Sequence, residues 1–345
     1  MGLTPKMLRK ALKIINIILK IREFYIFLII LTISIIISFL NPAFLTATNI
    51  LDIIRSYSFM GILTVGITVV MISGGIDVSF TAIASISSYI MGIILRLFTG
   101  NLFIAFIIVA FIGISLGLIN ALLIYFLKVP TIVVTISTLN LYYGLLIFFS
   151  KGKWIQVLPN YIKRLGSTYV FTLINSKSGA LSGLSIFTII WIVIILLTWV
   201  LLKYTVIGRS IYAMGGNIEA ARREGLNIFK LQLFIYSFMG FISGTAGLVH
   251  VGLNQTIAPN AIVGKELITI AAVVIGGANL AGGSGTLLGT TLGVALLAVI
   301  SNGLTLARVT SFWQNVIIGI ILIISVATTA YQRTYAKKRI KRVNI

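Results

Sequence analysis

The sequence is a succession of long apolar runs joined by short polar or glycine-rich connections. A helix needs about 20 apolar residues to cross the hydrocarbon core of a bilayer. Hydrophobic residues make up 59% of the 345-residue chain and charged residues only 10%, whereas a soluble domain is usually about a quarter charged. The runs therefore exclude a soluble globule and predict an all-α, polytopic membrane protein.

We expect about ten transmembrane helices in a domain that covers residues 24–330. The predicted segments are 24–40, 57–73, 79–97, 102–127, 131–149, 185–202, 231–251, 267–281, 286–307 and 312–330. The third and the eighth segment adjoin broken or glycine-rich stretches near 73–79 and 276–286. A break at such a place interrupts the helical hydrogen bonding inside the membrane.

The basic residues predict the orientation of the chain. About two thirds of the 27 lysines and arginines fall before the first segment, in a loop at 203–230, at Lys128 and in a basic tail at 331–345. Loops rich in lysine and arginine stay in the cytoplasm. We therefore expect a multi-pass protein of the cell's inner (plasma) membrane with both termini in the cytoplasm and an outer loop at 150–184. Residues 1–23 predict a cytoplasmic amphipathic segment on the inner surface, although this segment and the tail could serve only as topology signals.

The net charge of +21 is compatible with nucleic-acid binding, but its distribution is not. The positive charge lies at the ends of apolar spans and in the tails, which suits anionic lipid headgroups. We therefore expect membrane lipids as partners and no nucleic acid. The chain has no cysteine and one histidine, His250, so it predicts no metal site, no cofactor and no catalytic residues.

A short polar helix is predicted inside the loop at 203–230. Asn217 is a good N-cap because its side chain accepts a hydrogen bond from a free backbone N–H. Glu219 falls in the first turn and Arg222 in the last, where the helix dipole favours their charges. Gly225 can take the left-handed conformation that ends a helix. So short a helix is marginal by itself, so it packs either on a partner protein or on the protein's own inner face.

Three sequence blocks resemble the ribose, xylose and autoinducer-2 class of ABC importer permeases. They are Gly208-Arg209-Ser-Ile-Tyr-Ala-Met-Gly215-Gly216-Asn217-x-Glu219-Ala220-Ala221-Arg222-x-x-Gly225, Ser73-Gly-Gly-Ile-Asp77-Val-Ser79, and Ile270 to Gly289 with Asn302-Gly303-Leu304 after it. The segment from Gly152 to Pro159 is similar to the autoinducer-2 and rhamnose branch.

This resemblance implies a function and a set of partners. It implies the permease subunit of a binding-protein-dependent importer, which moves a monosaccharide or an autoinducer-2-like small polyhydroxylated molecule inward. A separate cytoplasmic ABC ATPase would hydrolyse ATP, an extracytoplasmic solute-binding protein would deliver the substrate, and a second permease copy would complete a homodimer or heterodimer. The helix that couples the ATPase would be formed by Asn217, Glu219, Ala220, Ala221, Arg222 and Gly225.

Asp77 is the acid that lies closest to a break in a membrane span. Acids inside membranes are costly and often functional. Asp77 and Ser79 could cap the start of the third segment, or they could belong to the gate or the substrate path. Asn279, in Gly-Gly-Ala-Asn279, echoes Gly-Gly-Ile-Asp77, and we include it among the path candidates because matching breaks in two halves mark transport sites.

Glycines recur every four residues in three places. The pairs Gly113 and Gly117, Gly240 and Gly244, and the series Gly285, Gly289 and Gly293 predict helix faces that approach their neighbours closely in lipid.

A different function class remains open, namely an ion-coupled secondary transporter of a small polar solute. Such transporters place ionisable groups along the path, and Asp77 is the main candidate for one here.

Overall fold

The computed structural model describes residues 22–98, 100–174, 181–310 and 312–321, together with positions 323 and 327. The predicted segment before residue 22, the end of the tenth membrane segment and the basic tail lie outside these residues.

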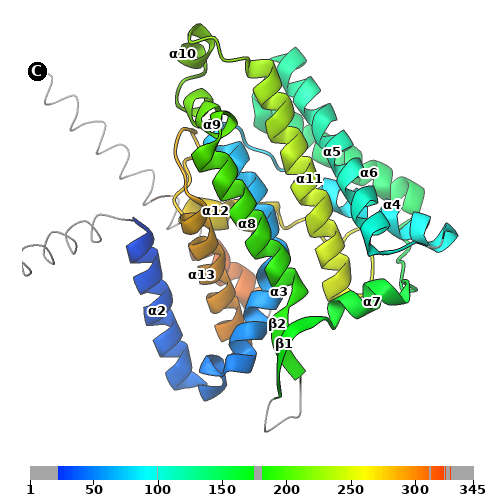
Figure 1. Ribbon diagram of the computed structural model, residues 1–345. Helices are drawn as coiled ribbons and strands as arrows, with labels where there is room; N and C mark the ends of the chain where they lie inside the picture. The colour runs from blue at the N-terminus through cyan, green and yellow to red at the C-terminus, as the bar shows by residue number, and fades with distance from the viewer. Residues whose placement is uncertain are drawn as a thin grey trace, which may run out of the picture.

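Helices form nearly all of the regular structure in this part of the chain (Figure 1). Eight of them are long and apolar enough to cross a membrane. They are α2 (Arg22–Leu40), α3 (Ala47–Ile72), α4 (Phe80–Leu97), α5 (Leu102–Leu127), α6 (Thr131–Ser150), α8 (Ile186–Tyr204), α11 (Ile228–Asn254) and α13 (Leu287–Leu306). Two shorter apolar helices, α12 (Glu266–Ile275) and Phe312–Ile321, fall in the eighth and tenth predicted segments, but each has about half the length that a membrane span needs. The prediction of an all-α polytopic fold is confirmed.

Helix α3 begins well before the predicted residue 57. Thr46 caps it by accepting a hydrogen bond from the Asn49 backbone N–H at 3.3 Å. The Asn49 side chain pairs with that of Asn302 at 3.1 Å, across to α13. These polar side chains find partners in neighbouring elements, so the helix continues where the apolar run alone stops.

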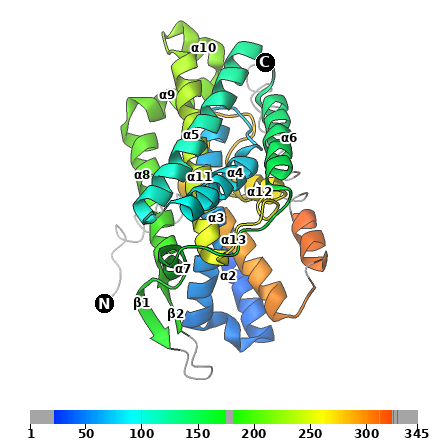
Figure 2. The same cartoon turned by 90° about the vertical axis from the view of Figure 1, so that its right-hand side faces the viewer.

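The remaining short elements lie at the two ends of the molecule. The 3-10 helix η1 (Pro42–Leu45), helix α7 (Asn160–Gly166) and the antiparallel pair β1 (Tyr169–Ile174) and β2 (Leu181–Ser185) lie at one end. Helices α9 (Val206–Gly216) and α10 (Ile218–Arg223) lie at the opposite end (Figures 1 and 2). The predicted outer and inner loops are therefore on opposite ends of the helix bundle.

Helices α3 and α11 form the centre of the bundle. In their most apolar stretches, 72% of the residues of α3 and 78% of those of α11 are buried, whereas only 6% are buried in α2. Ile62, Leu63 and Met239 are among the fully buried side chains that these two helices contribute to the main core. The segments that carry the candidate residues pack around this pair.

Glycines bring α5 and α11 into backbone contact. A Cβ atom placed on Gly113 would overlap the carbonyl of Gly240, and one on Gly240 would overlap the carbonyl of Gly113. Gly244 faces the carbonyl of Val109 in the same way. Close approach of this kind maximises van der Waals contact where lipid offers no hydrophobic drive. The predicted packing of these glycine faces is confirmed.

Helix α13 approaches α12 through Gly289 and Gly293, whose Cβ atoms would overlap the carbonyls of Gly276 and Ala272. The prediction that Gly285 belongs to the same helix face is wrong. The helix begins only at Leu287, because Thr286 caps it by accepting from the Gly289 N–H at 3.0 Å.

We predict that Gly240→Ala destabilises the protein, because the added methyl group has no space between α5 and α11. Overpacking of this kind costs about 1–3 kcal/mol, which lowers the thermal midpoint measured by tryptophan fluorescence in detergent. Gly144→Ala is the matched control, since Gly144 is also inside a long helix but has no atom within 4 Å of its Cβ position. An equal loss of stability in both variants would contradict the packing argument.

Candidate functional site

The N-terminus of helix α10 is capped by the side chain of Asn217, the residue that precedes the helix. The Oδ1 atom of Asn217 accepts hydrogen bonds from the backbone N–H groups of Glu219 and Ala220, both at 3.0 Å. These are two of the donors that the first turn of a helix leaves free. The predicted N-cap is confirmed.

The end of α10 is closed by a Schellman motif. Gly225 has φ = +81°, and its N–H donates to the Arg222 carbonyl at 3.1 Å while the Leu226 N–H donates to the Ala221 carbonyl at 3.1 Å. A residue with a side chain is strained in this left-handed conformation. Arg222 and Glu219 form an ion pair at 3.5 Å whose side chains are 61% and 64% exposed, so the caps and not this pair define the helix.

One side of α10 packs against the rest of the protein and the other side is exposed to solvent. Ala221 is buried against the body of the protein, whereas Glu219, Ala220 and Arg223 are exposed. Helix α9, which precedes it, inserts Ile211 fully into the main core. The α9–α10 unit is thus a rigid projection of the bundle that presents a small, polar, uncovered surface.

Three segments that are distant in the sequence meet just below α9. The Gly283 N–H donates to the Ile72 carbonyl at 2.8 Å. A Cβ on Gly215 would overlap that same carbonyl, and one on Gly282 would collide with Gly74. We call these five residues the glycine junction. It joins the end of α9 directly to the break after α3 and the break after α12.

The two breaks are built alike. After α3 the N–H groups of Gly74 and Gly75 donate to carbonyls of the last helical turn, and after α12 those of Gly277 and Ala278 do the same. Gly74 (φ = +86°) and Gly277 (φ = +103°) are both left-handed.

Each break then continues with an equivalent turn. Oδ1 of Asp77 accepts from the Ser79 N–H at 2.7 Å, and Oδ1 of Asn279 accepts from the Ala281 N–H at 2.8 Å. The two breaks therefore share a local structure, but not in the register of the sequence echo, because the echo aligns Gly74 with Gly276 whereas the left-handed residues are Gly74 and Gly277.

Asp77 lies at the centre of a buried polar network. It is 1% exposed and also accepts from the Ser79 hydroxyl at 2.6 Å. The Asn120 amide donates to the Ser79 Oγ at 2.7 Å, and the Tyr142 hydroxyl donates to the Asn120 Oδ1 at 3.1 Å. The network links the start of α4 to α5 and α6. Its bond from the Ser79 N–H to the Asp77 carboxylate closes a turn before α4, and Ser79, the N-cap residue of that helix, makes no side-chain capping bond.

Helix α6 also holds the first break from the other side. Thr131 accepts from the Ile76 N–H at 3.0 Å, and the Thr135 hydroxyl donates to the Ile76 carbonyl at 3.1 Å. Asn279 takes part in neither set. The hydrogen bonds given for it in the described structure stay within its own loop, including its N–H to the Ser284 carbonyl at 2.9 Å.

The sequence interpretation missed several of these residues. Asn120 and Tyr142 are polar positions inside apolar runs, and an asparagine within a predicted span is a signal that could have identified the first of them. Glu266, a second acid buried in the bundle, is only 8% exposed. It accepts hydrogen bonds from the Thr81 hydroxyl and, at 3.0 Å, from the Gly264 N–H.

The described residues bring together no group of three or more histidine, cysteine, aspartate or glutamate side chains that could hold a metal ion.

The chain is similar to known permeases over most of its length. The family model described as "branched-chain amino acid transport system / permease component" matches residues 49–326, a range that includes α10, the glycine junction and both breaks. No solved structure matches the chain.

Two kinds of named relatives stand out in the comparison. The ribose import permease protein RbsC of Bacillus subtilis is 36% identical over 293 residues, which cover 85% of this chain and 88% of the relative. The autoinducer 2 import system permease protein LsrC of Photorhabdus luminescens is 33% identical over 290 residues, 83% of each. The ribose permease of Haemophilus influenzae is 31% identical over 305 residues, 87% of this chain and 90% of the relative.

A family model that spans most of the chain, relatives of nearly full length and a bundle of apolar helices agree with one another. The chain belongs to this family of multi-pass membrane permeases, and it is a component of a transport system and not an enzyme.

Proposed function

We propose that this permease moves a small polyhydroxylated molecule, a monosaccharide or autoinducer 2, into the cell as the membrane subunit of an ABC importer. The names of its relatives support this substrate class. The observation that carries the proposal is the connection of an exposed, doubly capped helix to two helix breaks through the glycine junction.

The ATPase subunit docks on α10 in this proposal. Asn217 and Gly225 close the helix at its two ends, so a load on it moves the whole unit and does not unwind it. Exposed Ala220 lets a partner surface approach closely, and Glu219 offers it a charge. The α9–α10 end of the molecule would then face the cytoplasm, in agreement with the expected inner loop.

The glycine junction passes movement of the dock to the substrate path. Gly215, at the end of α9, touches the backbone of both breaks. Because backbones in van der Waals contact leave no free space between them, a displacement of α9 also displaces the loops at 73–79 and 276–286. Asp77, Ser79 and Asn279 lie in these loops, which is why we keep them as candidates for the gate or path.

The other partners follow from the same orientation. The solute-binding protein docks at the opposite end, where α7 and the β1–β2 hairpin of the outer loop lie. A second permease copy packs laterally in the plane of the membrane and completes the path. The protein then resides in the inner (plasma) membrane with both termini in the cytoplasm.

An ion-coupled secondary transporter is the alternative, and the buried Asp77 and Glu266 are the groups that would carry the ion. The Asp77 carboxylate accepts hydrogen bonds from the neutral N–H and hydroxyl donors of Ser79, which suits a structural carboxylate as well as an ion carrier.

We predict that Gly225→Pro removes the ATPase from the purified complex and lowers transport about tenfold or more, because proline cannot adopt φ = +81°. Co-purification and uptake into proteoliposomes measure the two effects. Gly152→Pro is the matched control, since Gly152 is also left-handed (φ = +68°) and follows a helix at the opposite end. Retention of the ATPase and of transport in Gly225→Pro would show that α10 is not the dock.

We predict that Gly215→Ala leaves the ATPase bound but uncouples it, because the new methyl group would overlap the Ile72 carbonyl and disturb the glycine junction. ATP hydrolysis would continue while uptake falls well below that of the parent. The neighbouring Gly216→Ala has free space at its Cβ and should transport within about twofold of the parent. Normal uptake by Gly215→Ala would contradict a role of the junction in coupling.

We predict that Asp77→Asn supports ATP-driven uptake, because an asparagine Oδ1 can accept both hydrogen bonds from Ser79. Asp77→Ala leaves these buried donors unsatisfied, which costs about 1–3 kcal/mol each and lowers the thermal midpoint. Uptake is measured in proteoliposomes with ATP but no ion gradient, and then with a gradient but no ATP. If only the gradient drives uptake and Asp77→Asn abolishes it, the secondary-transporter alternative replaces the importer.

A further inference from the structure

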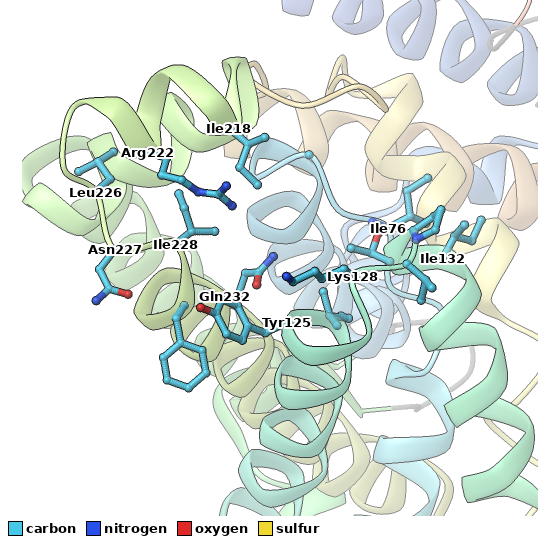
Figure 3. A pocket seen from close by; sticks show the side chains of 16 residues that line it. Ile76, Tyr125, Lys128, Ile132, Ile218, Arg222, Leu226, Asn227, Ile228 and Gln232 are labelled. Carbon is cyan, nitrogen blue, oxygen red and sulfur yellow. Dashed lines mark hydrogen bonds between the residues drawn. The ribbon is translucent and has the colours of Figure 1, made fainter.

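A basic cavity of about 820 Å³ lies beside α10 and reaches Gly74 and Ile76 at the first break (Figure 3). It opens between the turn that joins α5 to α6 and the segment that joins α10 to α11. Among the residues that line it are Tyr125, Lys128, Arg222, Phe229 and Gln232. Its size is that of a small-molecule site.

Two cations enter the cavity without an acidic residue among those that line it. Figure 3 shows that the charged ends of Lys128 and Arg222 extend into it from opposite sides. Within the part of the chain that the structure describes, Arg222 forms an ion pair with Glu219 that is exposed to solvent, and Lys128 forms none. A site with this balance attracts an anion, and paired basic groups suit a phosphate group.

The positions of the cationic groups are set by the backbone. Lys128 is the C-cap of α5 in the left-handed conformation, with φ = +54°, and Pro130, two residues later, is the N-cap of α6. Arg222 belongs to the doubly capped α10. The two charges therefore face each other across the cavity as a consequence of the fold.

A third polar group favours a hydroxylated ligand. The Oε1 atom of Gln232 is buried and has no hydrogen-bond partner, although Gln232 lines the cavity. A buried acceptor without a donor costs free energy. A hydroxyl group beside the phosphate would satisfy it.

The walls of the cavity continue into the apolar surface of the bundle. Tyr125 and Phe229 are in ring contact at 4.5 Å, and Phe126 joins them with its ring 5.4 Å from that of Tyr125. Phe126 is 68% exposed and Val133 is 51% exposed, so apolar surface leads away from the cations along α5 and α6. A ligand with acyl chains fits this continuity, and a soluble phosphate does not use it.

We propose that the basic cavity binds the headgroup of an anionic phospholipid. Lys128 and Arg222 bind its phosphate, and Gln232 accepts from a headgroup hydroxyl such as that of phosphatidylglycerol. Basic pockets between membrane helices on the cytoplasmic side bind such headgroups. The assignment to the inner leaflet rests on the proposed function. Because the cavity spans from α10 to the α5–α6 turn, the lipid bridges the dock and the helices that hold the first break.

The test is native mass spectrometry of the full chain, purified alone and with its ATPase, after exchange into phosphatidylglycerol and phosphatidylcholine of identical acyl chains. We expect about fivefold enrichment of phosphatidylglycerol for each cation involved. Lys128→Gln and Arg222→Gln should each lose that factor. Lys151→Gln is the matched control, since Lys151 ends α6 in the same left-handed conformation (φ = +51°) at the opposite end, and it should bind like the parent.

Four results would overturn the proposal. They are equal binding of the two lipids, an equal loss in Lys151→Gln, displacement of phosphatidylglycerol by millimolar inorganic phosphate, and its displacement when the ATPase binds. The third result would assign the site to a soluble phosphate compound, and the fourth would assign the cavity to the ATPase.

The lipid measurement is independent of transport, so the two proposals can fail separately. Selective lipid binding that is lost in Lys128→Gln, in a chain that recruits no ATPase, would support the lipid site and refute the dock. ATP-driven uptake by a chain without lipid preference would do the reverse.

Discussion

Direct contact between backbones, at positions where a side chain is missing, is the interaction on which the rest of this permease depends. In a bilayer the burial of apolar side chains gives little drive for helix association, so van der Waals contact must supply it. Gly113 against Gly240 joins α5 to the central α11, and Gly289 against Gly276 joins α13 to α12. Each contact permits no added atom, which fixes the relative position of the helices.

The same principle connects the surface of the molecule to its interior. Helix α10 is short and exposed, and by itself it could not transmit a displacement. Helix α9 gives it a base, with Ile211 in the core and Gly215 against the two breaks. Both breaks end a helix with a Schellman motif and continue with a side-chain-capped turn, so Gly215 contacts two loops of similar construction.

Charge is distributed according to the cost of burial. The buried acids Asp77 and Glu266 accept hydrogen bonds from hydroxyl and backbone groups, which compensates for their loss of water. The basic residues Lys128 and Arg222 instead remain exposed around an open cavity. The hydrogen bonds of the buried acids hold the loop before α4 and the start of α12 in place.

The existence of the long apolar helices and the form of α10 were determined by the sequence alone. A span is recognised by its apolar length, because lipid requires every backbone group to be satisfied within the helix. The cap at Asn217 and the end at Gly225 involve bonds between residues at most five positions apart, so local sequence suffices.

Tertiary structure alone decided which distant segments meet. Asn120 bonds to Ser79 across 41 positions of the chain, and Gly283 meets Ile72 across a still longer interval. The early start of α3 and the convergence of Lys128 and Arg222 on one cavity are of the same kind. A glycine or an amide in a run of apolar residues indicates that a close contact or a hydrogen bond exists, but its partner depends on how the whole bundle packs.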